Sequence, residues 1–412
     1  MDALRILKEA SENPDYHFEP DVRDVEGWRR IEELALRLFE SADSEHLDFL
    51  EDYAFDRNAP MPVLIALKLA RSKSYLTEIR KPVHISIVYA VYNEIRRMKR
   101  QGEDPAGEDF VIRKIEQMEF LTSGIDGVSW DMYIIDDGCP HGSGKEILKI
   151  LRERAAGYMD RVHVGFLQNA IERSVEVVGD LSSPDESRKG GSILYGMYLA
   201  SRIQRENHVI IYTDADLSTH LGQSGLLVYP IIRRGKRGAI GTRRHRKSVV
   251  IKRGKRNVRG KLFIYLWKQM LYVLDYITDT QCGFKGFDAE TVRRIIPGVK
   301  EKKFAFDIEI LLKVEMLERG SMEVVPIAWI DSEEASTTTS LNPYLDMLKS
   351  VARMYRDYLK PTPRADAFAR LVENMTPQEW ERLLDNVPRQ IAEGDPEEFS
   401  GLHLPIEMFM TH

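Results

Sequence analysis

The fold is decided by residues 208–216, which read HVIIYTDAD. The apolar first half is typical of a buried strand in a parallel sheet, and such strands present functional groups at their carboxyl ends. Asp214 and Asp216 follow the strand directly. Two carboxylates one residue apart form a small oxygen site that suits Mg²⁺ or Mn²⁺ carrying a diphosphate. The alternative is a polar loop that happens to hold two acids, so the other strand ends decide between the two interpretations.

Strand-like and helix-like segments alternate on both sides of this stretch. The expected strands are Val83–Val88, Met132–Ile135, Arg161–Phe166 and Val209–Tyr212. Helical patterns fill the gaps, for example Lys145–Ala155 and Ser192–Gln204. This alternation predicts an α/β fold with a mostly parallel sheet and right-handed crossovers.

The length of 412 residues is more than one ordinary domain needs. Residues 1–80 are predicted to be a helical, acidic N-terminal extension, residues 81–340 the α/β domain, and residues 341–412 a helical C-terminal region. With 43% hydrophobic and 30% charged residues, the chain has ample material for a core. The apolar residues 262–277 are interrupted by Lys268 and Asp275, so we expect a buried or interfacial helix there.

The cysteine content and the first residues of the chain indicate the cellular compartment. Only Cys139 and Cys282 are present, so no disulfide framework is expected. The sequence from Met1 lacks the apolar stretch of a signal peptide. We therefore expect a cytoplasmic protein, with contact at the periphery of a membrane as a further option.

Residues 233–261, here called the basic segment, hold fourteen Lys and Arg and no Asp or Glu, although the net charge of the chain is −6. Such a segment favours an anionic partner: a diphosphate, a phosphorylated acceptor or an anionic membrane surface. A solvated loop is the alternative. Nucleic acid is not expected, because aromatic side chains do not interleave the charges as base stacking requires.

Two further strand ends carry polar groups. The first strand is followed by Tyr92 and Glu94, and the second by Asp136 and Asp137. A carboxylate at such a position can accept hydrogen bonds from a ribose or a base. The alternative for the aspartates is a pair of helix N-caps, where acids are favoured.

A helix is expected to open at the sequence Arg188-Lys189-Gly190-Gly191. Glycines at a helix N-terminus beside two cations are suited to clamp a phosphate or a base.

These strand ends, in this order, resemble those of family 2 glycosyltransferases of the GT-A fold. Residues 85–94 (ISIVYAVYNE) look like the opening strand of that family, residues 134–138 (IIDDG) like its second nucleotide-contacting segment, and residues 214–216 like its metal motif. The resemblance covers roughly residues 82–360. It implies a Rossmann-like, mostly parallel sheet flanked by helices, here with helical N- and C-terminal extensions.

A narrower resemblance is to dolichyl-phosphate β-glucosyltransferases and related polyprenyl-phosphate glycosyltransferases. It lies in residues 279–285 (DTQCGFK), supported in order by residues 188–191, 241–243, 304–309 and 326–329. The motif before Gly190 is one residue shorter than usual, which leaves open whether Arg188 or Lys189 makes the nucleotide contact. We expect no membrane-anchoring helices of the kind that are common in that group.

The resemblance implies a metal-dependent, inverting hexosyltransferase with a nucleotide-sugar donor, UDP-glucose before GDP-mannose. The predicted donor-binding residues are Tyr92, Glu94, Asp136, Asp137, Arg188, Lys189, Asp214, Arg243, Arg256 and Arg259. The predicted ligands of Mg²⁺ or Mn²⁺ are Asp214 and Asp216. Gln281 and Lys285 are expected to bind sugar hydroxyls or phosphate.

The need for a catalytic base depends on the acceptor. A hydroxyl must lose a proton as it attacks, whereas a phosphate monoester is already largely anionic at neutral pH. Asp279 is the first candidate for an acceptor-side or base role and Asp307 the second, with a helix N-cap as the alternative for Asp307. His220 lies four residues beyond Asp216; an approach to the metal is the alternative, and an ordinary surface histidine is expected.

A phosphate-bearing acceptor, lipid-linked or soluble, is the favoured prediction. The alternatives are transfer to a hydroxyl of a small metabolite or polysaccharide, a sugar nucleotidyltransferase, and a non-catalytic sugar-nucleotide sensor. The terminal helices leave dimerisation, partner docking and contact with an anionic membrane open, and a homodimer is one option.

Overall fold

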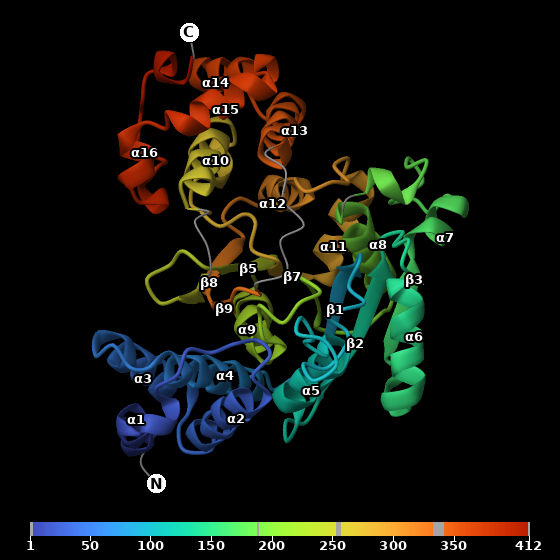
Figure 1. Ribbon diagram of the computed structural model, residues 1–412, viewed down its shortest axis with the longest axis vertical. Helices are drawn as coiled ribbons and strands as arrows, with labels where there is room; N and C mark the ends of the chain where they lie inside the picture. The colour runs from blue at the N-terminus through green and yellow to red at the C-terminus, as the bar shows by residue number, and fades with distance from the viewer. Residues whose placement is uncertain (1–2, 188, 253–256, 333–341, 411–412) are drawn as a thin grey trace.

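The computed structural model describes residues 3–187, 189–252, 257–332 and 342–410. The strands of its main sheet are β1 Val83–Val91, β2 Val128–Asp136, β3 Val162–Phe166, β4 His208–Thr213, β5 Gly238–Thr242, β7 Phe284–Asp288 and β8 Met322–Pro326. In the described residues these form a seven-stranded sheet in the order β3-β2-β1-β4-β7-β5-β8 (Figure 1). A separate parallel pair is made by β6 Val249–Ile251 and β9 Ala328–Ile330.

Strand β7 runs antiparallel to both of its neighbours, β4 and β5, whereas the other neighbouring strands pair in parallel. The register places Thr213, at the end of β4, opposite Phe284, at the start of β7. The residues that precede β7 therefore lie at the same edge of the sheet as the residues that follow β4. This edge is called the carboxyl edge below.

One face of the sheet shares a hydrophobic core with the N-terminal helices and with three helices of the α/β region. The helices that contribute to this core are α1 Ala3–Glu12, α2 Val25–Phe39, α3 Ser44–Asp56, α4 Met61–Thr77, α5 Phe110–Thr122, α6 Ser143–Arg154 and α9 Ser224–Arg234. On β1 the core-facing side chains alternate, as in Ile85, Ile87 and Tyr89, because successive side chains of a strand point to opposite faces.

The opposite face shares its core with the C-terminal helices and with other helices of the α/β region. These helices are α7 Leu167–Glu172, α8 Gly190–Ser201, α10 Asn257–Met270, α11 Ala289–Ile295, α12 Phe306–Leu317, α13 Asn342–Tyr358, α14 Pro363–Asn374, α15 Pro377–Asp385 and α16 Arg389–Glu393. In Figure 1 the helices α1 to α4 lie at the lower end of the molecule and α13 to α16 at the upper end.

Several helices begin where the sequence places a capping side chain. The carboxylate of Asp24 accepts a hydrogen bond from the Gly27 N–H at the start of α2. At the start of α15, Thr376 and Glu379 form a reciprocal capping box. Such caps satisfy N–H groups that have no partner within the helix.

The predicted fold class is confirmed: a mostly parallel sheet is flanked by helices and extended by helices at both ends. The boundaries 1–80, 81–340 and 341–412 stay a prediction. The helices at both ends share cores with the sheet.

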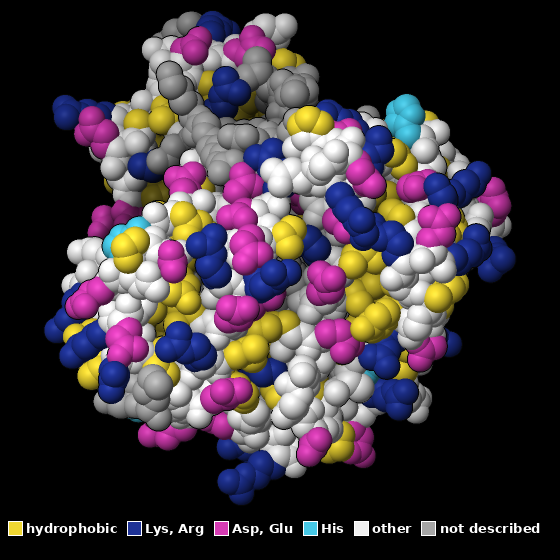
Figure 2. All heavy atoms as spheres, turned by 60° about the horizontal axis from the view of Figure 1, so that its bottom comes forward, with side chains coloured by type: hydrophobic (Ala, Val, Ile, Leu, Met, Phe, Trp, Pro, Cys, Tyr) yellow, Lys and Arg dark blue, Asp and Glu magenta, His cyan; other side chains and the backbone are white. Residues whose placement is uncertain are grey.

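The apolar residues 262–277 form most of α10 and the short 3₁₀ turn Tyr272–Leu274, and Leu262 to Leu271 lie almost entirely in the core. The expectation of a buried helix is thus confirmed. Among the described residues, no helix combines the length and the apolar character that crossing a membrane requires. On the face displayed in Figure 2, Lys and Arg side chains lie among Asp and Glu side chains and do not form one separate patch.

Candidate active site

The predicted site residues gather at the carboxyl edge. The ends of β1, β2, β4 and β5 meet there with residues 279–283, which lead into β7. Segments that are far apart in the sequence therefore contribute to one site. This is the edge at which open α/β sheets bind ligands.

Asp214 follows β4 and stands in an ion pair with Lys189 Nζ. About a third of its side chain (35%) is exposed. Burial would raise the pKa of Asp214, but the Lys189 ammonium outweighs burial and holds this pKa below its ordinary value. Gly283 leaves room for the carboxylate, because a Cβ at that position would collide with both carboxylate oxygens. Asp214 is therefore an ionised and accessible carboxylate.

Lys189 has an unusual backbone conformation, with φ of +83°. Residues other than glycine seldom adopt positive φ, and such conformations persist only where the surroundings hold them. The Lys189 N–H donates to Asp137 Oδ2 at 2.8 Å while the side chain reaches Asp214. Burial lowers the pKa of Lys189, but Asp214 and Asp307 more than offset this and raise it. The loop thus presents a fixed cation to the carboxyl edge.

Asp216 is less exposed than Asp214 and is held from two sides. Its Oδ1 accepts a hydrogen bond from the Ser218 N–H at 3.0 Å, and its Oδ2 lies 3.4 Å from Arg97 Nη1. Arg97 also forms an ion pair with Glu94, with 2.6 Å between Nε and Oε2. Burial raises the pKa of Glu94 to about 7, although Arg97 opposes the shift. The Arg97 guanidinium therefore links the carboxylates of Glu94 and Asp216.

Two charged residues near Asp216 are not indicated by the sequence. Glu108 accepts hydrogen bonds from the Leu217 N–H at 3.0 Å and from Ser332 Oγ at 2.5 Å. Lys114 of α5 is fully buried, lies over the Tyr89 ring at 5.3 Å, and has no hydrogen-bond partner among the described residues. Burial lowers the pKa of Lys114 to about 8, while Asp216 and Asp214 oppose the shift. Only their position in the fold identifies these residues, because each lies in an ordinary helical or loop sequence.

Asp136 and Asp137 at the end of β2 are both buried and hold the neighbouring loops. Asp136 accepts hydrogen bonds from the N–H groups of Cys139 at 2.8 Å and Gly144 at 2.6 Å. Asp137 Oδ1 accepts from the hydroxyls of Ser187 and Ser192, each at 2.6 Å. Burial raises the pKa of Asp137, and these hydrogen bonds oppose the shift. The loops before α6 and α8 are thereby fixed, and the donor-binding role of the two aspartates stays a prediction.

Asp279 and Arg243 form a buried ion pair in two parallel hydrogen bonds. Arg243 Nη2 donates to Oδ1 at 2.7 Å and Nε to Oδ2 at 2.8 Å, and the Arg243 N–H adds a third at 2.9 Å. Burial would raise the pKa of Asp279, but the Arg243 guanidinium holds it well below its usual range. The guanidinium also lies 5.2 Å from the centre of the Trp329 ring. Asp279 therefore orients Arg243 and is a very weak base.

Asp307, in the first turn of α12, differs from Asp279 in that its pKa is raised and not lowered. Its Oδ1 accepts hydrogen bonds from the Tyr212 hydroxyl and from Lys285 Nζ, the latter at 3.2 Å. Tyr212 and Lys285 are paired across β4 and β7. Burial raises the pKa of Asp307 to about 8 and lowers that of Lys285 to about 8. The pair can hold or release a proton near neutral pH.

Of the remaining predicted residues, three lie in described parts of the chain and two lie outside them. Tyr92 is exposed beyond the end of β1, and Arg259 is exposed in the first turn of α10. Gln281 Nε2 is buried without a hydrogen-bond partner in the part of the chain that the structure describes. Arg188 and Arg256 lie outside the described residues.

Asp214 and Asp216 are chemically suited to a divalent cation. Mg²⁺ bound with a phosphate-bearing substrate takes one or two protein carboxylates and fills its other positions with phosphate oxygens and water. The room that Gly283 leaves beside Asp214 is compatible with this. In the described ranges there is no group of three or more His, Cys, Asp and Glu side chains that could hold a metal.

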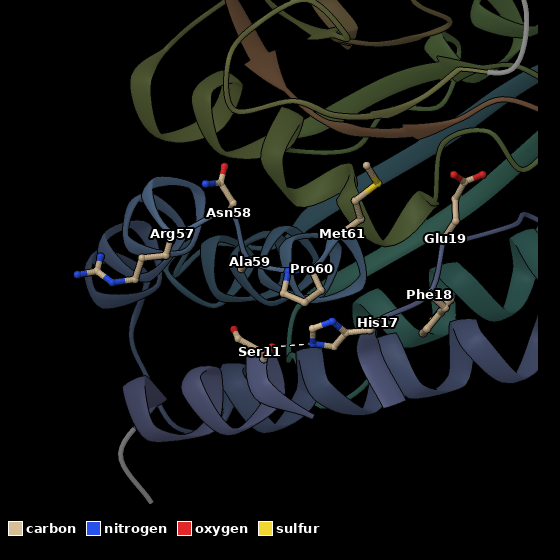
Figure 3. A pocket seen from close by; sticks show the side chains of 9 residues that line it. All are labelled: Ser11, His17, Phe18, Glu19, Arg57, Asn58, Ala59, Pro60 and Met61. Atoms are coloured by element: carbon tan, nitrogen blue, oxygen red, sulfur yellow. Dashed lines mark hydrogen bonds between the residues drawn. The ribbon is translucent and has the colours of Figure 1, made fainter. Parts of the chain in front are cut away.

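A pocket of about 500 Å³ lies in the N-terminal helices and is separate from this edge (Figure 3). Its lining comes from two segments, residues 11–19 and 57–61, and includes none of the predicted site residues. His17 Nε2 bonds the backbone oxygen of Ser11 at 2.9 Å, and Arg57 points away from the other lining side chains. The pocket offers no cluster of groups that would select a ligand.

Comparison with known proteins finds several dolichyl-phosphate β-glucosyltransferases of similar sequence. Dolichyl-phosphate β-glucosyltransferase of Saccharomyces cerevisiae is 24% identical over 292 residues, which are 67% of this chain and 75% of that protein. The enzyme of the same name from Dictyostelium discoideum is 26% identical over 294 residues, which are 69% of this chain and 78% of that protein. No family model matches the chain.

Among solved structures, glucosyl-3-phosphoglycerate synthase from Mycobacterium tuberculosis, in complex with Mn²⁺, UDP and glucosyl-3-phosphoglycerate, has a TM-score of 0.45 at 14% identity. The match covers 72% of this chain and 85% of that one. The sequence relatives confirm the predicted resemblance to dolichyl-phosphate β-glucosyltransferases and the prediction of a glycosyltransferase.

Proposed function

The chain is a relative of the dolichyl-phosphate β-glucosyltransferases, and from this relationship we propose the reaction that its carboxyl edge performs. It transfers a sugar from a nucleotide diphosphate, with UDP-glucose favoured over GDP-mannose, to a phosphate-bearing acceptor. The transfer depends on Mg²⁺ or Mn²⁺ and inverts the anomeric carbon.

The observation that carries this proposal is the Asp214–Lys189 pair at the end of β4, with Asp216 beside it. An accessible carboxylate next to a fixed ammonium suits a diphosphate that arrives with a cation: the carboxylates hold the cation, and Lys189 meets a phosphate oxygen. When bound, the cation would neutralise the charge that develops on the leaving diphosphate. Asp214 and Asp216 would hold it, and Arg97 and Glu94 would keep Asp216 in position.

The acceptor is proposed to bind on the side of Arg243. This guanidinium is oriented by Asp279 and is backed by two cations of the basic segment, Arg244 and Lys252. Burial lowers the pKa of both Arg244 and Lys252; Asp279 opposes this shift, and the neighbouring Arg243 adds to it. An anionic acceptor would relieve this repulsion. Such a surplus of positive charge supports a phosphate-bearing acceptor, as the names of the relatives also do.

A second candidate is transfer to a hydroxyl, and Asp307 supports it. A hydroxyl acceptor needs a base whose pKa is close to the working pH, and the pKa of Asp307 is about 8. Asp307 is therefore proposed as the base in that case, ahead of Asp279, whose pKa is held too low by Arg243. Lys285 and Tyr212 would stabilise its charged form.

The test is a transfer assay with labelled UDP-glucose and Mn²⁺, in which a short-chain dolichyl phosphate is compared with the dolichol of the same length. Transfer to the phosphate alone supports the favoured proposal, and Asp307→Asn should then retain activity. Transfer to the hydroxyl, lost in Asp307→Asn, supports the second candidate. In a parallel reaction with UTP and glucose 1-phosphate, release of pyrophosphate, without sugar transfer from UDP-glucose in the first assay, would contradict both and indicate a nucleotidyltransferase.

A further inference from the structure

The N-terminal helices contact loops that carry the candidate active site. The fully buried Lys68 of α4 pairs with Glu51 of α3 and donates to the backbone oxygen of Pro326, at the end of β8, at 3.2 Å. Asp52 of α3 forms an ion pair with Lys247 of the basic segment. These helices are thus joined to the site by polar contacts as well as by the shared core.

The contact nearest in sequence to the predicted metal ligands is made by His220. The expectation of a surface histidine is wrong, because only 1% of this side chain is exposed. Its Nδ1 accepts a hydrogen bond from the Gly222 N–H at 2.9 Å. The proton of the neutral ring is therefore on Nε2, which donates to Glu32 Oε1 of α2 at 2.9 Å.

The ring of His220 is also enclosed by aromatic side chains. Trp28 of α2 stacks on it at 5.0 Å with an interplanar angle of 23°, and Phe120 of α5 meets it edge-on at 6.0 Å. A Cβ on Gly222 would lie 2.7 Å from Nδ1, so only glycine leaves the ring its place. His220 consequently has one position, and both Glu32 and Trp28, which define it, belong to α2.

The loop between Asp216 and His220 is short and is bonded along its length. The Leu217 N–H donates to Glu108, the Ser218 N–H donates to Asp216, and the Ile330 N–H donates to the Ser218 oxygen. A close-packed loop of this kind transmits a displacement at one end to the other. A change in the position of His220 should therefore change that of Asp216.

We propose that α2 is a supporting part of the active site: Glu32, acting through His220, fixes the loop that carries Asp214 and Asp216. Glu32 is a positioning residue, since it touches neither the predicted donor site nor the acceptor site. The inference rests on the proposed function in one respect, namely that these aspartates hold a divalent cation. It also assigns a task to the N-terminal helices, which the sequence leaves open.

The test uses the full chain and measures Mn²⁺ binding in the presence of UDP, by electron paramagnetic resonance of free Mn²⁺. Glu32→Ala should weaken Mn²⁺ binding about tenfold, a usual size for coupling between separate sites. Glu32→Gln keeps an oxygen that accepts from Nε2, so it should bind Mn²⁺ as the unchanged protein does. Glu26→Ala is the matched control, because Glu26 lies on the same helix and, among the described residues, pairs only with the exposed Arg29.

A second readout separates this inference from the proposed function. Hydrogen exchange of residues 214–222 should be faster in Glu32→Ala than in Glu32→Gln and Glu26→Ala, whether or not Mn²⁺ binds. If the unchanged protein bound no Mn²⁺ but exchange rose as expected, the metal role would fall and the positioning role would stand. Unaltered Mn²⁺ affinity and unaltered exchange in folded Glu32→Ala would overturn the inference, even if this variant melted at a lower temperature.

Discussion

The ion pair between Asp279 and Arg243 predicts a large loss of stability in Asp279→Asn. The Asp279 side chain is 3% exposed and accepts three hydrogen bonds from Arg243. An amide at this position removes the charge and leaves the guanidinium without its counter-ion. Removing one partner of a buried pair typically costs about 3–5 kcal/mol. Because 22% of the Arg243 side chain is exposed to solvent, we expect a loss of stability at the lower end of this range, about 3 kcal/mol.

The assay is urea unfolding followed by circular dichroism on Asp279→Asn, Arg243→Gln and the double variant. The double variant should lose clearly less stability than the sum of the single losses, because each single change leaves the same charge pair broken. Arg389 and Glu393 provide a control: they pair at 2.9 Å, but their side chains are 84% and 65% exposed. Glu393→Ala should leave the unfolding midpoint unchanged. A loss below about 1 kcal/mol in Asp279→Asn, or strictly additive single losses, would refute the reasoning.

Three further predictions concern pH and the metal. With a hydroxyl acceptor, the transfer rate should rise about tenfold per pH unit up to about pH 8, where Asp307 becomes deprotonated, and Asp307→Asn should abolish this rise. Burial, followed by the charge of His84, lowers the pKa of His208 to about 4, so that the unfolded chain takes up the proton before the folded chain does. The unfolding free energy should therefore fall by up to about 3 kcal/mol as the pH drops from 6.5 to 4. Gly283→Ala should weaken Mn²⁺ binding measured by calorimetry, since its Cβ would collide with the Asp214 carboxylate.

Each of these expectations has a result that contradicts it. An identical pH–rate profile in the unchanged protein and in an active Asp307→Asn variant would exclude Asp307 as the base. If His208→Gln showed the same acid-induced loss of stability as the unchanged protein, another group would be responsible. Mn²⁺ affinity that Gly283→Ala leaves intact would mean that the room beside Asp214 is not used by the metal.

The central strands can be predicted because they are buried on both faces. All six residues of β4 are buried, and such a strand appears in the sequence as a continuous apolar run followed by polar residues. The same pattern is enough to place Asp214 and Asp216 at a strand end. Strands β5, β7 and β8 are shorter and contain glycine, lysine or glutamate, so their local sequence is not distinctive. These segments form strands because they pair with neighbouring strands in the sheet.

The partners within the site cannot be predicted from the sequence, because they depend on contacts across the fold. From the sequence, Asp279 is the first candidate for the base. The sequence does not reveal that the Arg243 side chain binds this carboxylate in two hydrogen bonds. Lys114 lies in an ordinary amphipathic helix, and only the packing of α5 against β1 buries its ammonium near Asp216. The expectation for His220 is wrong for the same reason, because Trp28 and Glu32 come from a segment nearly two hundred residues away.

The most direct test of the central claim is calorimetric titration of the protein with UDP-glucose, with and without Mn²⁺, for the unchanged chain and for Asp214→Asn. We predict binding that requires Mn²⁺ and is lost in a folded Asp214→Asn variant. UDP-glucose binding that is independent of Mn²⁺ and equal in both proteins would contradict the proposed metal-dependent donor site at the end of β4.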